Sequence, residues 1–415
     1  QFNVQRRMPR TVTEDAKPVR PWTLDVGRET MNKKIFIVAG EASGDLHGAD
    51  LARALLSLDQ EITLLGMGGE QMRRAGVKLL VDAGELAAVG ITEAFSRLAA
   101  LTGAFRRLRA ALAAEDPALL LLIDFPDFNF WLARASRRMG IPVLYYISPQ
   151  VWAWRKGRIR TLKHLVEKML VIFPFEEALY REAGIPVAFV GHPMLDRLQD
   201  VPTREEARRQ MGHGPSDLIV GLLPGSREGE VRHHLPVLKA AVAQMVKTEP
   251  RAHFLLAVAD SLPPGLVESF LQESDSPIRP VRGQTYKIMR AADLLIMASG
   301  TATLEAGLLG TPMIIIYRVS RITWWTGRLL VDVPAIGMVN LVAGKRVVPE
   351  LVQWDFTPER VAKAALELLQ SPEALRSIRQ ELHDVRGRLG EAGASLRAAR
   401  EVLKTLYEVE ARSRG

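Results

Sequence analysis

Short apolar runs of strand length recur along this chain, and helix-like stretches separate several of them. In the first half the runs are Lys34–Val38, Ile62–Leu65, Leu119–Ile123, Val143–Ile147 and Met169–Ile172. Strands that read as continuous hydrophobic runs and alternate with helices are typical of a parallel sheet buried on both faces. The pattern therefore predicts an α/β domain built on such a sheet.

The same pattern starts again after a polar segment, Asp200–Asp217. The new runs are Leu218–Leu223, Phe254–Val258, Leu294–Met297 and Met313–Ile316. Two successive series of this kind imply two Rossmann-like domains with a cleft between them. We expect the first domain over residues 31–195, the second over 196–371, and C-terminal helices over 372–415 that pack toward the first domain.

Length and composition agree with two domains and exclude several kinds of site. The chain has 415 residues, is 47% hydrophobic and contains no cysteine, which excludes disulfides and cysteine-ligated metals. Its uncharged stretches are shorter than the roughly 20 apolar residues of a spanning helix, so we expect no transmembrane helix. Residues 1–30 lack the apolar core of a signal peptide, and we expect a disordered extension or an over-long gene start there.

The stretch AGEASGDLHG, residues 39–48, follows the first apolar run. It has neither the G-x-G-x-x-G spacing of a dinucleotide site nor the Gly-Lys-Ser/Thr ending of a phosphate loop. Its polar residues stand at the carboxyl edge of the first strand, where open α/β sheets bind ligands. We therefore expect an acceptor cleft lined by Glu41, Ser43, Asp45 and His47, although Ser43 and Asp45 also suit helix caps.

Two stretches of the second half also follow strands. Leu223-Pro224-Gly225-Ser226-Arg227 offers a glycine, exposed N–H groups and a fixed cation, which suits a diphosphate. Ala298 to Glu305, ASGTATLE, opens a helix with small residues and hydroxyls, and Glu305 suits a ribose diol. An ordinary turn and tight helix packing are the alternatives. Farther on, Asn340, Glu350 and Gln353 are either cleft residues or solvated loop residues.

The stretch DFPDFN, residues 124–129, ends a very hydrophobic strand with two carboxylates three residues apart. Apolar surroundings raise the pKa of a carboxyl group and make it a better general base. One of Asp124 and Asp127 is therefore the candidate base for an attacking hydroxyl, and the other can cap the next helix. The sequence does not distinguish the two roles.

The segment from Ser148 to Lys163, SPQVWAWRKGRIRTLK, interleaves tryptophans with basic residues, and the whole chain has a formal charge of +8. A membrane surface, single-stranded nucleic acid and a solvated helix face all suit this composition. For the membrane interpretation, the contact residues are Trp152, Trp154, Arg155, Lys156 and Arg158.

Taken together, AGEASGDLHGA, DFPDFN, SPQVWAWR, GHP, LPGSREGEV, ASGTATLEAGLLGTPMIIIYR and NLVAG…PELVQ resemble the lipid-A-disaccharide synthase family in order and spacing. The resemblance covers almost the whole chain from Met31. It implies a GT-B fold and a metal-independent, inverting transfer of 2,3-diacylglucosamine from UDP to 2,3-diacylglucosamine 1-phosphate. It also implies a base within DFPDFN and UDP contacts from Gly225, Ser226, Arg227, Ser299, Gly300, Thr301, Glu305 and Asn340.

The resemblance has consequences for partners and location. Acylated substrates reside in a membrane, so we expect peripheral binding to the cytoplasmic face of the inner membrane of a Gram-negative bacterium. We expect no metal, no other cofactor and no nucleic acid, and the helical tail leaves open a homodimer formed through the C-terminal helices. Two rival interpretations are a UDP-sugar 2-epimerase of the same fold and a non-catalytic basic protein that binds nucleic acid. The acidic residues Glu41, Asp45, Asp124 and Asp127 argue against the second.

Overall fold

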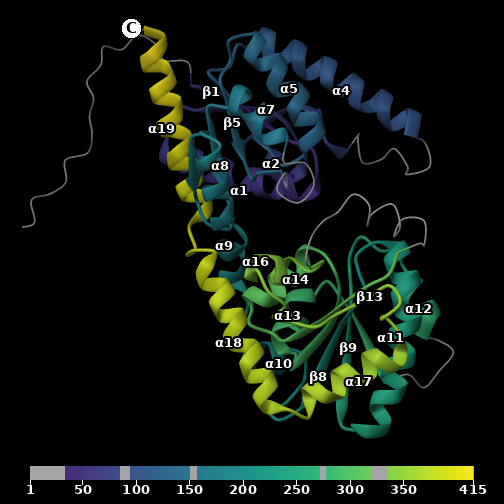
Figure 1. Ribbon diagram of the computed structural model, residues 1–415. Helices are drawn as coiled ribbons and strands as arrows, with labels where there is room; N and C mark the ends of the chain where they lie inside the picture. The colour runs from purple at the N-terminus through teal and green to yellow at the C-terminus, as the bar shows by residue number, and fades with distance from the viewer. Residues whose placement is uncertain (1–32, 85–93, 150–156, 272–276, 320–334, 415) are drawn as a thin grey trace, which may run out of the picture. The chain divides into compact units, whose positions relative to one another are not determined.

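The computed structural model of the protein (Figure 1) describes residues 33–84, 94–149, 157–271, 277–319 and 335–414. The segment 1–30 lies outside these residues. Within them, two parallel sheets follow one another along the chain, one complete by Phe189 and the other beginning at Leu218. The two predicted α/β series are therefore confirmed.

The first sheet has seven parallel strands in the order β3-β2-β1-β4-β5-β6-β7. The strands are β1 (Lys34–Ala39), β2 (Thr63–Gly68), β3 (Lys78–Asp82), β4 (Leu119–Ile123), β5 (Val143–Tyr146), β6 (Lys168–Val171) and β7 (Val187–Phe189). The chain reverses its direction of winding between β1 and β4, which pair with Ile35 opposite Leu119. Ligands of open α/β sheets bind beyond the carboxyl ends of the strands at such a switch point.

The second sheet repeats this topology with six parallel strands in the order β10-β9-β8-β11-β12-β13. The strands are β8 (Leu218–Leu223), β9 (Ala252–Val258), β10 (Ile278–Arg282), β11 (Leu294–Ala298), β12 (Met313–Tyr317) and β13 (Glu350–Val352). Its switch point lies between β8 and β11, where Leu294 pairs with Val220. This strand order is that of a Rossmann fold.

Helices connect the strands and form the C-terminal tail. They are α1 (Ala42–Leu58), α2 (Glu70–Arg74), α4 (Ala94–Glu115), α5 (Pro126–Arg138), α7 (Arg158–Leu165), α8 (Pro174–Glu182), α9 (Met194–Arg197) with the 3-10 turn η1 (Leu198–Asp200), α10 (Arg204–Gln210), α11 (Glu228–Thr248), α12 (Leu266–Leu271), α13 (Thr285–Ala291), α14 (Thr301–Leu308), α16 (Met338–Ala343), α17 (Pro358–Leu369), α18 (Pro372–Arg388) and α19 (Ala394–Arg414). None of the helices in the described segments is long and apolar enough to cross a membrane.

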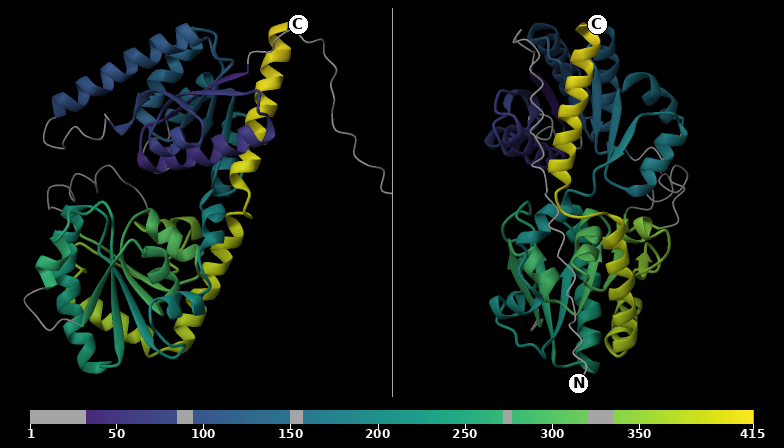
Figure 2. Two further views of the ribbon diagram at one scale, coloured as in Figure 1. Left: turned by 180° about the vertical axis from the view of Figure 1, so that it is seen from behind. Right: turned by 90° about the vertical axis from the view of Figure 1, so that its left-hand side faces the viewer.

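Both faces of each sheet are buried, as the continuous apolar runs predict. In β1, Ile35 and Ile37 join the core on one face, while Phe36 and Val38 join the core on the other. In β8, Val220 and Leu222 face a core of their own. Figure 2 shows helices on both sides of the second sheet. Burial of each such side chain contributes about 1.5–3 kcal/mol to the free energy of unfolding.

The C-terminal tail divides between the two halves of the chain. Helix α18 packs against α14, α16 and α17, whereas α19 packs against α1 and β6. The carboxylate of Asp196 accepts the backbone N–H groups of Ala394 and Ser395 at 3.2 and 3.1 Å, which caps the start of α19. From the sequence we predicted that the C-terminal helices pack toward the first domain. Helix α19 does so, whereas α18 packs against helices that follow the first sheet in the chain.

Candidate active site

The turn that follows β4 has an unusual backbone. Asp124 and Phe125 both have left-handed conformations, with φ of 45° and 51°, and such a conformation costs a non-glycine residue about 1–3 kcal/mol. The Asp124 carbonyl accepts the Tyr145 hydroxyl at 2.6 Å and the Asn129 amide at 2.5 Å. These two buried side chains hold the strained turn in place at the switch point of the first sheet.

Asp124 lies in surroundings that suit a base. Burial raises the pKa of its carboxyl group to about 6, and the neighbouring Glu41 carboxylate adds to the rise. The turn after β1 lies against the turn after β4, because a Cβ on Gly40 would come within 2.2 Å of the Phe125 ring. The sequence stretches 39–48 and 124–129 therefore meet at one place.

Asp127 has a different environment, in the first turn of α5. Its side chain is 69% exposed and pairs with the guanidinium of Arg158, which stacks over the Phe130 ring at 5.1 Å. The segment of Arg158 was predicted to contact a membrane, and the structure gives this residue a partner within the chain. The other predicted membrane contacts, Trp152, Trp154, Arg155 and Lys156, lie outside the described residues.

The polar residues of α1 divide into exposed and structural groups. Glu41 is the N-cap residue, and Ser43 is exposed in the first turn. Asp45 is buried instead, and its carboxylate accepts backbone N–H groups of Gly69, Gln71 and Met72 at 2.7, 3.1 and 3.0 Å. Asp45, which lies in α1, thus caps the start of the neighbouring helix α2.

His47 belongs to a partly buried polar cluster that the sequence did not bring together. Burial lowers the pKa of His47 to about 4, and the nearby Arg197 adds to the shift. Burial likewise lowers the pKa of His192 to about 3, and its Nδ1 accepts the Met194 N–H at 3.2 Å. Arg197 also lies 3.9 Å from the Asp50 carboxylate. Of this cluster, the sequence had singled out His47, as a cleft residue, and the GHP stretch that contains His192.

In the second sheet, the predicted phosphate loop follows β8 at its carboxyl end. Gly225 has φ of 129°, and a Cβ there would lie 2.4 Å from the Glu230 carboxylate. That carboxylate accepts the N–H groups of Ser226 and Arg227 at 3.1 and 3.4 Å and lies 3.2 Å from the Arg227 guanidinium. The donors expected for a diphosphate are therefore held by Glu230, as in a capping box.

The second predicted stretch follows β11, beside β8. Ser299 donates its hydroxyl to the Ile336 carbonyl at 2.8 Å, and Thr301 is exposed at the start of α14, with Gly300 as the N-cap residue. Glu305 accepts the Tyr286 hydroxyl at 2.7 Å. Burial raises the pKa of Glu305, and Tyr286 and Arg197 oppose that rise. Tyr286 is a partner that the sequence did not suggest.

Asn340 has a structural role in the loop that follows α16. Its amide donates to the Val348 carbonyl and the Glu350 carboxylate, both at 2.9 Å. Its carbonyl oxygen accepts from Val347 and Val348 at 2.8 and 3.0 Å. The side chain is buried and its hydrogen-bonding groups are used within the chain, so a contact to UDP would require rearrangement.

Glu350 and Gln353 also bond to the backbone. The Glu350 carboxylate accepts the N–H groups of Ile336 and Gly337, both at 3.0 Å. The Gln353 amide exchanges hydrogen bonds with the backbone of Val319 at 3.2 and 2.9 Å. These residues fix the loops beside β12 and β13.

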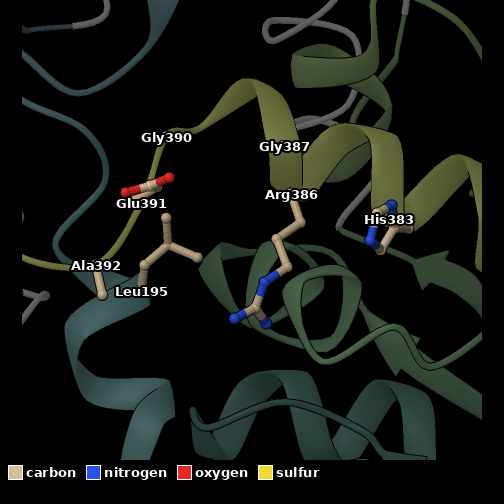
Figure 3. Close-up of a pocket in the computed structure, with 7 residues that line it drawn as sticks. All are labelled: Leu195, His383, Arg386, Gly387, Gly390, Glu391 and Ala392. Atoms are coloured by element: carbon tan, nitrogen blue, oxygen red, sulfur yellow. The ribbon is translucent and has the colours of Figure 1, made fainter. Parts of the chain in front are cut away.

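A separate pocket of about 280 Å³ lies where α18 gives way to α19. Figure 3 shows its lining, which includes His383, Arg386 and Glu391. Arg386 donates to the Leu308 carbonyl at 2.8 Å and so binds the C-terminal end of α14. None of the predicted site residues lines this pocket, and the carboxyl edges of the sheets remain the candidate site.

Comparison with solved structures supports the fold. A kitacinnamycin glycotransferase matches with a TM-score of 0.61 and 17% identity over 90% of this chain and 99% of its own. Acinetobacter baumannii MurG matches with a TM-score of 0.57 and 14% identity over 90% and 99%. The UDP-GlcNAc 2-epimerase of Neisseria meningitidis gives a TM-score of 0.56 and 14% identity over 89% and 99%. At such identities the likeness shows the fold alone, which is GT-B.

Sequence comparison goes further than the fold. The model of the lipid-A-disaccharide synthetase family matches residues 35–403. The lipid-A-disaccharide synthase of Syntrophus aciditrophicus is 48% identical over 89% of this chain and 97% of its own length. That of Geobacter sulfurreducens is 46% identical over 91% and 98%. The chain belongs to the lipid-A-disaccharide synthase family of glycosyltransferases.

Proposed function

We propose that this glycosyltransferase joins UDP-2,3-diacylglucosamine to 2,3-diacylglucosamine 1-phosphate, giving a β-1,6-linked disaccharide 1-phosphate and UDP. Family membership supports the class of product. The observation that carries the mechanism is the Asp124 carboxyl group, half-buried near Glu41 on a strained turn at the switch point of the first sheet. Strained backbone and raised pKa values concentrate at functional sites.

Inversion at the anomeric carbon needs one base and a stabilised leaving group. A carboxyl group with a pKa of about 6 is mostly ionised at neutral pH, yet it binds a proton more tightly than an ordinary aspartate. Asp127, one helical turn away, offers an exposed carboxylate. In the proposal, one of Asp124 and Asp127 takes the proton of the acceptor hydroxyl as its oxygen attacks.

For UDP, we propose the switch point of the second sheet, with Gly225, Ser226 and Arg227 on one side. Ser299, Gly300, Thr301 and Glu305 lie after the neighbouring strand, so both stretches follow carboxyl ends. The Arg227 guanidinium and the N–H groups that begin α14 would neutralise the leaving diphosphate, so we expect no metal requirement. Diphosphate binding would require Glu230 to release its backbone donors.

For the membrane, we propose peripheral binding at the cytoplasmic face of the inner membrane, where acylated substrates reside. The net charge of +8 favours an anionic lipid surface. Binding to vesicles with anionic lipid that falls steeply with salt is the expected result. Equal binding to neutral vesicles would contradict the electrostatic part of the proposal.

The test of the reaction is UDP release from UDP-2,3-diacylglucosamine, measured with and without the acceptor, in detergent and with excess chelator. Release that requires the acceptor and resists the chelator is the expected result. Release without any acceptor would instead favour the epimerase-like or hydrolytic alternative. Loss of acceptor-dependent release in chelator would remove the metal-independent mechanism.

A further inference from the structure

Two imidazoles and a carboxylate come together at the amino ends of β8 and β9. In the described part of the chain, one ligand atom each from His213, Asp217 and His253 lies within 4.8 Å of the others. His213 Nδ1 is 3.3 Å from Asp217 Oδ2, and the rings of His213 and His253 lie 4.7 Å apart. The proposed UDP site follows the opposite, carboxyl ends of the strands, so this cluster is separate from it.

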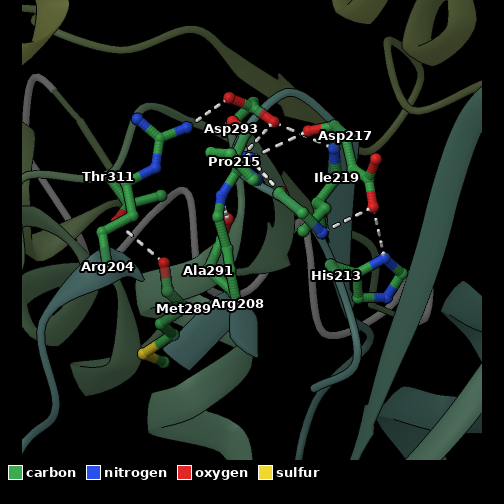
Figure 4. Close-up of polar contacts among 11 residues, drawn as sticks. Arg204, Arg208, His213, Pro215, Asp217, Ile219, Met289, Ala291, Asp293 and Thr311 are labelled. Carbon is green, nitrogen blue, oxygen red and sulfur yellow. Dashed lines mark hydrogen bonds and ion pairs between the residues drawn. The ribbon is translucent and has the colours of Figure 1, made fainter. Parts of the chain in front are cut away.

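The loop that carries two of these residues is held rigidly. The guanidinium of Arg208 donates to the carbonyls of Gly214, Pro215 and Asp217 at 3.2, 2.8 and 3.0 Å. Arg208 is itself fixed by the Asp293 carboxylate at 2.7 Å, as Figure 4 shows. The loop between α10 and β8 therefore presents His213 and Asp217 in a fixed arrangement, which lowers the entropic cost of binding a ligand.

His213 has the character of a metal ligand. Its side chain is 8% exposed, and Nδ1 is the ring nitrogen that faces Asp217. The other nitrogen, Nε2, is buried and has no hydrogen-bond partner within the described segments. Burial and the neighbouring His253 lower the pKa of His213, and Asp217 opposes that shift. Neutral imidazole is the form that binds metal ions.

We propose that His213, Asp217 and His253 bind a divalent transition metal ion such as Zn²⁺. Two imidazoles and a carboxylate are a common donor set for zinc, with bonds of about 2.0–2.2 Å. Because ligand atoms bound at that distance lie closer together than 4.8 Å, His253 would turn inward, which its exposed position allows. The bound ion would tie the loop to β9 and stabilise the second sheet.

The charges around the cluster set an upper limit on its affinity. The guanidinium of Arg279 donates to the Met211 carbonyl at 3.2 Å. Its positive charge repels positive charge at His213. Arg279→Gln should therefore tighten Zn²⁺ binding. The proposed metal is structural, so it does not conflict with transfer activity that resists a chelator.

The experiment is Zn²⁺ titration by calorimetry on the untagged, chelator-treated full chain at neutral pH, with thermal unfolding measured in parallel. His253→Gln removes an exposed ligand, and because that side chain is exposed we expect the fold to stay intact. His383→Gln is the matched control with an exposed histidine elsewhere. We expect Zn²⁺ to raise the melting temperature of the wild type and of the control. In His253→Gln the affinity should fall by about tenfold or more.

Two results would overturn the proposal. One is a Zn²⁺ affinity of His253→Gln equal to that of the wild type. The other is a Zn²⁺ affinity of Asp217→Asn equal to that of the wild type. Both readouts are independent of turnover. A failed proposal for UDP transfer would therefore leave the zinc result interpretable.

Discussion

The switch points of the two sheets have the same strand order but different construction. Beyond β4, Asp124 and Phe125 form a strained turn, and burial raises the pKa of Asp124 to about 6. Beyond β8, small residues and backbone N–H groups dominate, and Glu230 satisfies the donors. In our proposal, one topology therefore supports two tasks: a carboxylate that transfers a proton and a loop that binds an anion. The residues that follow the strands decide the task, not the fold.

The largest expected effect comes from the carboxylates of the first switch point. Asp124→Asn and Asp127→Asn should identify the base, because loss of a general base lowers turnover by about 10²–10⁴-fold. UDP-sugar binding should be retained in both. Steady-state kinetics with the acylated substrates measures the effect, and Glu70→Gln, an exposed carboxylate on α2, is the control. Full activity in both aspartate variants would disprove the assignment.

The next effect concerns Arg227 at the second switch point. Arg227→Ala should raise the barrier by about 2–4 kcal/mol, as loss of other groups that stabilise developing charge does. Arg232→Ala is the matched control, because Arg232 is exposed on the same helix and pairs with Glu228. The measurement is kcat/KM for the donor. An unchanged value in Arg227→Ala would remove this residue from the mechanism.

Asn340 distinguishes a structural role from a contact to UDP. Asn340→Ala removes the acceptor of the Val347 and Val348 N–H groups and the donor to the Val348 carbonyl. The Glu350 carboxylate loses one of its donors and keeps the N–H groups of Ile336 and Gly337. We therefore expect the free energy of unfolding to fall by about 2–3 kcal/mol. Urea unfolding measures it, with the exposed Gln380→Ala as control. Unaltered stability together with lost UDP affinity would show that the side chain acts on the ligand instead.

A smaller effect is expected in the pH dependence. Asp124 is ionised only above a pKa of about 6. When Asp124 is the base of the pair, kcat/KM should therefore fall about tenfold per pH unit below that value. Asp124→Asn should lose this acidic limb. An acidic limb in the wild-type pH profile of kcat/KM that is centred near the pKa of an ordinary aspartate would contradict the raised pKa of Asp124.

The raised pKa of Asp124 affects stability in the opposite direction to activity: the free energy of unfolding should fall as the pH rises. Its pKa is raised in the folded state, from 3.8 to about 6, so the folded chain binds the proton more tightly than the unfolded chain does. The contribution of Asp124 is most favourable below its unfolded pKa and is lost as the pH rises through about 6. Asp124→Asn should therefore be more stable than the wild type at neutral pH by about 2–3 kcal/mol.

The central strands could be predicted from the sequence, and the outer strands could not. Runs such as Leu119–Ile123 are buried on both faces and read as continuous apolar stretches. The strands that sequence reasoning missed, β3, β7, β10 and β13, are the outermost strands of the two sheets. Edge strands are partly exposed, as in Ile278–Arg282, so their sequences lack that signal.

The candidate site shows a similar division. Sequence position places Glu41, Asp124, Arg227 and Thr301 at carboxyl ends of strands, because parallel strands end at one edge. Hydrogen-bond partners depend on residues far apart in sequence, and no local pattern encodes them. Asp45, which looked like a cleft residue, caps α2. Asn340, in α16, likewise closes the loop that follows its helix.

In our proposal, the first switch point performs proton transfer while the second binds UDP. The most direct test of this proposal is the equilibrium affinity of the double variant Asp124→Asn/Asp127→Asn for UDP, measured by calorimetry beside the wild type. We expect affinities that agree within about twofold although turnover is lost. A loss of about tenfold or more, equivalent to about 1.4 kcal/mol, would show that the carboxylates help to hold the nucleotide and would contradict this division of tasks.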